Sequence, residues 1–176
     1  MTITGWPLTL DQFLALPEAK PALEFGPHGE VTQKMSPTSE HSLIQSRFDR
    51  RLNDHAEPRG LGVAYPELRV ILGGESRVPD LAFYRAGREP GPGYATTPPD
   101  LVIEIASPGQ SRTELADKCA WYIHQGVSLA LLVDPVDRSV RAFPAASTLR
   151  ATDVLPFGDL LPGLQMSVAE VFAALA

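Results

Sequence analysis

The stretch that decides the fold is Pro99-Asp100-Leu101-Val102-Ile103-Glu104-Ile105-Ala106, an apolar run that follows Asp100 and contains a second acid, Glu104, near its end. Its length and its β-branched residues predict a buried strand. Side chains alternate along a strand, so one face is expected to carry Val102, Glu104 and Ala106. Glu104 then lies among apolar neighbours, where an isolated carboxylate would carry a large desolvation cost. It must be protonated, paired with a base or bound to a cation.

A second acid occupies an equivalent position in Val78-Pro79-Asp80-Leu81-Ala82-Phe83-Tyr84. The same alternation places Asp80 on one face with Ala82 and Tyr84. If the two strands are neighbours in a sheet, Asp80 and Glu104 can converge on one ion. Two carboxylate oxygens, a backbone carbonyl and waters are a donor set that suits magnesium. The competing interpretation is that Asp80 only shapes the strand entry after Pro79 and that Glu104 makes a core salt bridge.

A lysine follows on the next element. The pattern from about Ser111 to Gln125 predicts a helix with Gly126 as its C-cap, and its apolar stripe consists of Leu115, Cys119, Tyr122 and Ile123. Lys118 lies at the edge of this stripe, from which it can reach inward. The alternative for Lys118 is a surface lysine that extends its charge into water. Tyr122 is expected in the core with its hydroxyl near the site.

The rest of the chain fits one α/β domain over residues 1–176. With 176 residues and 44% hydrophobic composition, the chain is long enough for one sizeable core. Helices are predicted from the capping pair Thr9 and Gln12 to before Pro17, from an N-cap at Ser36 to Pro58 and Gly60, and from Ser167, which has a capping partner in Glu170. Strands are predicted at 22–25 and 30–35 as a hairpin, and at 61–72, 79–84, 101–106, 129–133 and 139–143. Residues 87–99 are predicted to form an exposed, mobile loop.

The composition also indicates the cellular compartment of the protein. The single cysteine, Cys119, excludes an internal disulfide and suits a reducing compartment. No uncharged apolar run reaches about 18 residues, and the first residues lack the features of a signal peptide. We therefore expect a cytoplasmic protein.

The charge balance weighs against a general nucleic-acid binder. The chain has 15 Lys plus Arg and 21 Asp plus Glu, a formal net charge of -6. Phosphate binding depends on clustered basic residues. Arg47, Arg50 and Arg51 form a local basic group, although such a group is more often a solvated helix face.

Taken together, these residues resemble the restriction-endonuclease branch called the Uma-two family, within the PD-(D/E)XK nuclease superfamily. The resemblance rests on the order of elements and on a set of sequence pieces: Leu23-Glu24-Phe25, Met35-Ser36-Pro37 with His41, Val78-Pro79-Asp80, residues 99–111, Lys118 with Tyr122, Gly126-Val127, Leu132-Val133-Asp134-Pro135 and Leu161-Pro162-Gly163-Leu164. It implies a restriction-endonuclease-like core, in which helices flank a mixed central β-sheet in the order α-β-β-β-α-β. An N-terminal strand hairpin and a C-terminal strand and helix would be added to this core.

The superfamily's acidic strand ends in acid-X-Lys, whereas here the third position is Ala106. In the branch that this chain resembles, the lysine has moved to the following helix, which points to Lys118. The resemblance implies metal-assisted phosphodiester hydrolysis, most simply of DNA, by a homodimer. Asp80, Glu104 and the Ile105 carbonyl would hold magnesium, with manganese as a substitute. Lys118 would position the attacking water and offset charge in the transition state.

Additional candidate site residues are Glu67, Glu40, His41, Gln33 and Tyr122. Glu67 is expected on a strand, as a further ligand or as an exposed partner of Arg69. Glu40 and His41 are expected near the apolar face of the long helix, where a histidine is usually a hydrogen-bonded core residue. Two other functions remain open, a nuclease-like domain that serves only as a binding or assembly module, and a structural α/β domain with ordinary salt bridges.

Overall fold

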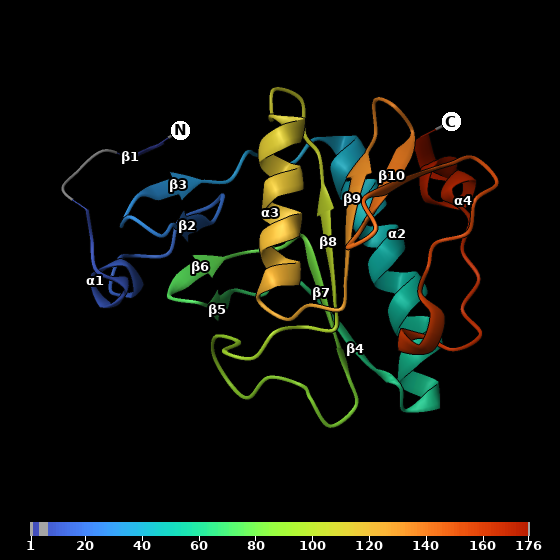
Figure 1. Cartoon of the computed structure of the whole chain (residues 1–176), viewed down its shortest axis with the longest axis horizontal. Coiled ribbons are helices and arrows are strands. Elements are labelled where there is room, and N and C mark those ends of the chain that lie inside the picture. The colour runs from blue at the N-terminus through green and yellow to red at the C-terminus, as the bar shows by residue number, and fades with distance from the viewer. Residues whose placement is uncertain (1, 4–6, 176) are drawn as a thin grey trace.

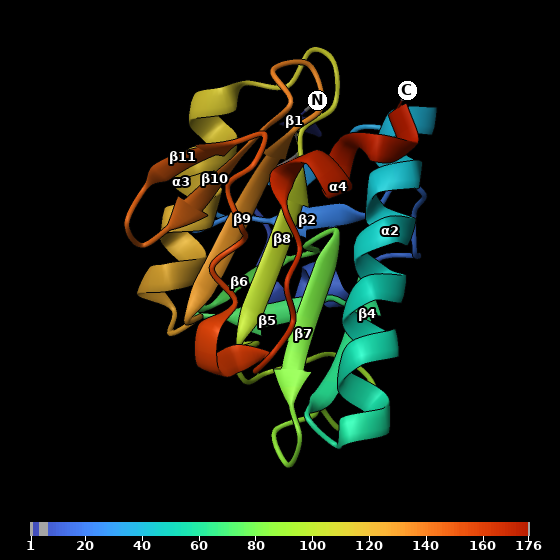
Figure 2. The same ribbon diagram turned by 90° about the vertical axis from the view of Figure 1, so that its right-hand side faces the viewer.

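The computed structural model describes residues 2–3 and 7–175. Its centre is a mixed sheet of six strands in the order β11-β10-β9-β8-β7-β4, in which only β8 and β9 run parallel. The strands are β4 (Gly62–Pro66), β7 (Leu81–Arg85), β8 (Leu101–Ile105), β9 (Leu129–Asp134), β10 (Ser139–Phe143) and β11 (Ser147–Arg150). Helices α2 (Ser39–Ala56) and α3 (Arg112–His124) cover opposite faces, as Figures 1 and 2 show.

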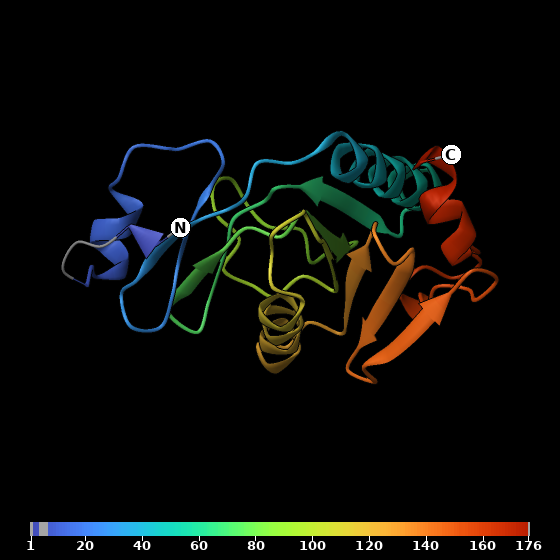
Figure 3. The same cartoon turned by 90° about the horizontal axis from the view of Figure 1, so that it is seen from above.

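A second, antiparallel sheet lies beside the central one, on the side seen at the blue end of Figure 3. Its strand order is β1-β3-β2-β6-β5, with β1 (Thr2–Ile3), β2 (Leu23–Phe25), β3 (Val31–Gln33), β5 (Val70–Leu72) and β6 (Glu75–Arg77). The remaining elements are α1 (Leu10–Leu14), α4 (Val168–Phe172) and the 3-10 turns η1 (Glu57–Arg59), η2 (Gly158–Leu160) and η3 (Ala173–Leu175). The predicted hairpin at 22–35 is therefore part of a larger sheet, and β1, β6 and β11 are not among the predicted strands.

The two faces of the central sheet follow the predicted alternation. Leu101, Ile103 and Ile105 pack with α2 and the C-terminal segment in the larger core cluster. Val102 and Ala106 pack beneath α3 with Cys119 and Tyr122. Glu104 shares the α3 face, because its phase is that of Val102 and Ala106. The strand sequence thus determines that its acid lies beneath α3.

The starts of the four α-helices show how side chains set the boundaries. Thr9 and Ser167 form the predicted capping boxes of α1 and α4. The predicted start of α2 at Ser36 and Pro37 is wrong by two residues, since Thr38 is the N-cap and accepts a hydrogen bond from the His41 N–H. A threonine oxygen can satisfy an unpaired helix N–H, and the residue before a proline is held extended, so the helix begins after this pair. The other long helix begins as predicted, with Ser111 as the N-cap of α3.

The segment 61–72 is not one strand. It splits into β4 and β5, which belong to different sheets, and Glu67 lies in the turn between them with a φ of 50°. Pro66 has no N–H to continue the ladder, which favours an ending there. Gly73 and Gly74, both with positive φ, then reverse the chain into β6. Alternation identifies extended segments but not their pairing partners, so the second sheet could not be predicted.

Residues 87–99 form a long and mostly exposed loop, as predicted, but its end is fixed. Ala95 is fully buried, donates its N–H to the Arg69 carbonyl and accepts a hydrogen bond from the Ile71 N–H. The expectation of an exposed segment is therefore wrong at Ala95 and at Pro99, which are buried. Within the described part of the chain, no helix is long and apolar enough to cross a membrane.

The core beneath α2 gives a direct test of this packing. Leu52 is fully buried, whereas Leu43, on the same helix, is 47% exposed. Leu52→Ala is expected to lower the free energy of unfolding by about 2–5 kcal/mol. The loss has two parts, the hydrophobic transfer free energy of the deleted carbon atoms and the cost of the cavity that they leave. Leu43→Ala is the matched control and should cost much less. Urea denaturation of both variants measures the difference, and equal losses would contradict the assignment of the buried face.

Candidate active site

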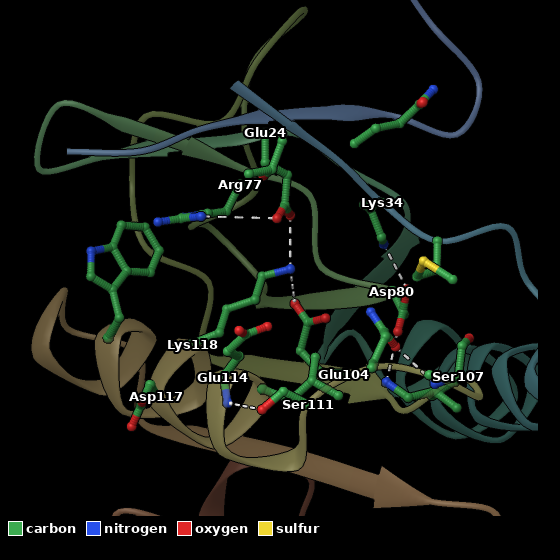
Figure 4. Close-up of a pocket in the computed structure, with 18 of the residues that line it drawn as sticks. Glu24, Lys34, Arg77, Asp80, Glu104, Ser107, Ser111, Glu114, Asp117 and Lys118 are labelled. Carbon is green, nitrogen blue, oxygen red and sulfur yellow. Dashed lines mark hydrogen bonds and ion pairs between the residues drawn. The ribbon is translucent and has the colours of Figure 1, made fainter. Parts of the chain in front are cut away.

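A cavity of about 720 Å³ lies between the second sheet, the end of β8 and one side of α3. Its charged lining comes from segments that are far apart in sequence: Glu24, Lys34, Glu75, Arg77, Asp80, Glu104, Glu114, Asp117 and Lys118. In Figure 4, Lys118 points between Glu24 and Glu104, and Lys34 points toward Asp80. The cavity is therefore polar, and acids outnumber lysine and arginine along its wall.

Asp80 and Glu104 meet here because of strand register. β7 and β8 are antiparallel neighbours, with Leu81 opposite Ile103. Continued by one residue, that register puts Asp80 opposite Glu104. Each residue is only 2% exposed, and both line the cavity. The two predicted metal ligands thus lie on adjacent strands in one cavity.

Asp80 is held by donors on both of its oxygens. Oδ2 accepts a hydrogen bond from the Ile105 N–H at 2.7 Å. Oδ1 lies 2.7 Å from Lys34 Nζ and 3.4 Å from His41 Nε2. The carbonyl of Asp80 also accepts a hydrogen bond from Gln45 Nε2. The carboxylate is therefore fixed in direction as well as neutralised.

Glu104 is held from the helix. Its Oε1 accepts a hydrogen bond from the Tyr122 hydroxyl at 3.0 Å and lies 2.9 Å from Lys118 Nζ. Both contacts are made by Oε1. No hydrogen bond or ion pair to Glu104 Oε2 is found among the described residues, so this oxygen remains free to bind a ligand in the cavity. Lys118 also lies 2.7 Å from Glu24 Oε1, so its ammonium bridges two glutamates (Figure 4).

These contacts shift the ionisation of each group. Burial alone would raise the pKa of Asp80, but the charges and hydrogen bonds of Lys34 and His41 outweigh it and hold that pKa well below its usual range. Burial raises the pKa of Glu104, and the neighbouring Asp80 charge adds to this effect against the opposing charge of Lys118. Burial disfavours the charged form of Lys118, but Glu104 and Glu24 raise its pKa strongly, so its ammonium stays protonated.

The vacant position in the acid-X-Lys pattern also has a structural counterpart. Ala106 is 2% exposed and lies in the same core cluster as Leu115, Cys119 and Tyr122 of α3. Its small side chain lets the helix pack against the strand end, and Lys118, one turn along from Leu115, reaches Glu104. The structure thus places Lys118 where the sequence predicted it. Its catalytic role remains a prediction.

The additional candidates separate into two groups. His41 and Gln33 line the cavity, and Gln33 Nε2 donates to the Pro21 carbonyl. Tyr122 lies directly behind the site as the hydroxyl donor to Glu104.

Glu40 and Glu67 are exposed and do not line the cavity. Glu40 lies in the first turn of α2, one turn before the buried Ile44, but it is exposed and its carboxylate accepts a hydrogen bond from the Ser39 hydroxyl. Glu67 lies in the turn after β4, so its expected place on a strand is wrong. A single residue at the end of an extended run carries no signal for such a turn.

Asp100 forms a second Pro-Asp pair in the chain, but it serves another purpose. It is fully buried at the start of β8 and does not line the cavity. Its carboxylate accepts hydrogen bonds from the Arg85 N–H and side chain and from Arg88 Nη1 at 2.6 Å. These hydrogen bonds attach the end of the long loop to β7. Of the two aspartates that follow a proline, Asp80 and not Asp100 therefore belongs to the site.

Several charged residues of the cavity wall are not among the predicted site residues, and Glu24, Lys34 and Arg77 are those that contact the predicted ones or their partners. Glu24 lies between two apolar residues of β2, the same signal that singled out Glu104, and could have been found by that rule. Lys34 follows β3 in a polar segment and carried no distinguishing pattern. Arg77 approaches Glu24 within 4.0 Å and pairs with Glu75, which accepts a hydrogen bond from Trp121 Nε1. Only the pairing of β2 with β6 brings these residues together.

The donor set fits a hard cation that keeps several waters. Among residues 2–3 and 7–175, no group of three or more His, Cys, Asp and Glu side chains is arranged to hold a metal ion. The pair of Asp80 and Glu104 supplies carboxylate oxygens, with the Ile105 backbone beside them. Magnesium is typically bound through one or two carboxylates and water, so this pair suits it and does not suit a closed zinc site.

A mixed sheet in α-β-β-β-α-β order, with two acids on adjacent strands and a lysine from the next helix, has the architecture of the restriction-endonuclease-like nucleases. The family model Uma2, described as "Putative restriction endonuclease", matches residues 10–169. The chain therefore belongs to this family. It is also similar to the crystal structure of "a putative nuclease belonging to DUF820" from Anabaena variabilis, with 31% identity and a TM-score of 0.88. That likeness covers 97% of this chain and 100% of the other. No curated protein matches the chain.

The opposite pKa shifts of the two acids predict opposite effects on stability. Because the pKa of Asp80 is lowered on folding, its carboxylate stabilises the fold above the unfolded pKa of about 3.9, and this contribution is lost as the pH falls. Asp80→Asn should therefore cost about 1–3 kcal/mol of unfolding free energy at pH 7 and a smaller amount at pH 3, where the carboxyl is mostly protonated in the unfolded chain but still ionised in the fold. Urea titrations at the two pH values measure both losses. A loss that is equal at both would contradict the assigned charge contacts.

Glu104→Gln should change the stability at pH 7 in the opposite direction to Asp80→Asn. Its raised pKa means that the carboxylate disfavours the fold above the unfolded pKa of about 4.3. The glutamine variant should therefore keep or gain stability at pH 7 relative to the parent. A large loss there would show that Glu104 serves mainly as a structural ion pair.

Proposed function

We propose that this protein is a magnesium-dependent endonuclease that hydrolyses phosphodiester bonds of DNA. The observation that carries the proposal is the convergence of Asp80, Glu104 and Lys118 in one cavity of a nuclease-like fold. Buried carboxylates with unlike environments are costly to maintain and are typical of functional sites. Family membership supports a nucleic acid as the substrate class.

The metal would be held by Asp80, Glu104 and the Ile105 carbonyl, and manganese would substitute for magnesium. When bound, such an ion lowers the pKa of a coordinated water and stabilises charge on a phosphoryl oxygen. Glu104 Oε2 is the oxygen open to it, whereas at Asp80 the ion would share or replace the contacts of Oδ1 with Lys34 and His41. The Ile105 N–H and the Tyr122 hydroxyl keep the two carboxylates in orientation.

Lys118 would act on the substrate. Its bridged position between Glu24 and Glu104 keeps the ammonium charged and limits its movement. A charged donor fixed in a partly desolvated site can orient the attacking water and offset the charge that develops on the phosphate in the transition state. Glu24 would position Lys118 rather than contact the reacting atoms. We also propose that the protein is a homodimer, whose two cavities would cut the two strands of a duplex.

One observation favours a second function. The cavity wall carries six carboxylates against three lysine and arginine side chains, two of the acids, Glu114 and Asp117, are exposed, and the chain has a net charge of -6. Such a surface opposes the close approach of phosphates. The alternative is therefore a nuclease-like binding or assembly module with little or no catalysis. Divalent cations at the acidic wall would reduce this repulsion.

Cleavage assays decide between the two functions. Purified protein incubated with plasmid and single-stranded DNA at low salt should cleave in magnesium or manganese and not in excess chelator. Glu104→Gln should abolish cleavage because it removes a ligand charge. Glu40→Gln is the matched control, the same change at an exposed position, and should keep full activity. Cleavage that survives in Glu104→Gln would mark a contaminating nuclease, and an inactive parent protein would favour the binding module.

Metal binding gives a prediction independent of turnover. Calorimetric titration of the parent protein with magnesium should show binding that Asp80→Ala and Glu104→Gln each abolish, because two carboxylates are the minimum donor set here. Circular dichroism of each variant checks that it is folded. Unchanged magnesium affinity in either folded variant would refute the assigned ligands.

A further inference from the structure

Each of the two strand carboxylates has its own lysine. Lys118 contacts Glu104, and Lys34 contacts Asp80 at 2.7 Å. Lys34 Nζ also donates to the Val78 carbonyl at 2.8 Å. The proposed reaction uses Lys118 but gives no part to Lys34, although the side chain of Lys34 is only 12% exposed and lines the same cavity.

Lys34 is placed to change partners. It lies in residues 34–38, which form neither helix nor strand and join β3 to α2. Its own N–H is anchored on the Ala22 carbonyl at 2.9 Å, so the backbone is fixed while the long side chain can rotate. Lys118, by contrast, is held by two glutamates, and Arg77 approaches two glutamates. Among the described cations of the cavity wall, Lys34 is the one with a single carboxylate partner.

Lys34 and a metal would compete for the same atom. A magnesium ion binds carboxylate oxygen at about 2.1 Å, and the Lys34 ammonium already contacts Asp80 Oδ1 at 2.7 Å. Two cations so close would repel strongly in a site with little water. At Glu104 the competition is weaker, because Lys118 contacts Oε1 and Oε2 is open.

We propose that Lys34 is the resting counterion of the metal site, which neutralises Asp80 until a divalent cation displaces its ammonium toward the phosphate of the bound nucleic acid. This inference rests on the proposed function. An ammonium is a strong phosphate ligand, and the released Lys34 would add positive charge to an acidic cavity only when metal is present. Asp80 would keep its orientation without Lys34, since the Ile105 N–H and His41 remain beside it.

The composition of the chain makes a direct test simple. The protein has three lysines, Lys20, Lys34 and Lys118. In the parent protein labelled with ¹⁵N-lysine, the Lys34 ammonium signal is expected to show slow proton exchange without metal, because the group is buried and paired. Saturating magnesium should shift that signal and speed its exchange, while the signal of exposed Lys20 stays unchanged. A Lys34 signal unaffected by saturating magnesium would overturn the proposal.

Variants separate this inference from the proposed function. Lys34→Gln should bind manganese about tenfold more tightly than the parent, as expected when a charged hydrogen bond no longer competes. Lys118→Gln removes the same charge and should have a smaller effect, and Lys20→Gln should have none. At saturating metal, Lys34→Gln should also cleave DNA more slowly than the parent. Lys34→Arg keeps the positive charge and should recover part of the parent cleavage rate.

The possible outcomes are distinct. If the parent binds metal and Lys34→Gln binds it no more tightly, Lys34 is not a competing counterion, and the proposed nuclease site still stands. If Lys34→Gln binds more tightly but cleaves at the parent rate, the phosphate contact is wrong. If the parent binds no divalent cation, the proposed function fails and this inference fails with it.

Discussion

The bridge that Lys118 makes between Glu104 and Glu24 is the interaction on which the site depends. It joins three parts of the fold, because Glu104 belongs to the central sheet, Lys118 to α3 and Glu24 to the second sheet. Without it, Glu104 would lie buried in the cavity with no cation in contact, and Glu24 would keep only the more distant Arg77. The position of the second sheet over the end of β8 is therefore coupled to the charge state of the site.

The same interaction explains how so many charges coexist in an enclosed space. Asp80, Glu104 and Glu24 are all nearly buried, and each is matched by a cation or by backbone N–H groups. The match is uneven, since Asp80 is strongly favoured as a carboxylate while the pKa of Glu104 is raised. A site arranged only for stability would not keep a carboxylate in such an environment. A divalent cation would relieve the repulsion between the two strand acids, which is the physical argument for a metal.

Much of the site could be read from alternation. The phase of residues 99–106 and 78–84 places Glu104 and Asp80 on the α3 face, and the small Ala106 together with the stripe edge at Lys118 indicates a lysine supplied by the helix. The core order of helix, three strands, helix and strand follows from the same patterns. These features are local in sequence, so a single chain carries enough information for them.

What could not be predicted depends on contacts between distant segments. Glu24 and Lys34 approach the strand acids because β2 and β3 join a sheet with β6, a short strand after Gly73-Gly74 that lies outside every predicted strand. The exposure of Glu40 and Glu67 depends on where one helix begins and one strand ends. A shift of one or two residues at such boundaries moves a side chain to another face.

The central claim is that Asp80 and Glu104 together form a divalent metal site. The most direct measurement is anomalous diffraction from a crystal of the parent protein soaked in manganese. The account predicts one dominant anomalous peak within bonding distance of carboxylate oxygens of both residues, with Lys34 Nζ moved away from Asp80. A peak elsewhere, or an ordered cavity in which both lysines keep their carboxylate contacts and no manganese binds, would contradict it.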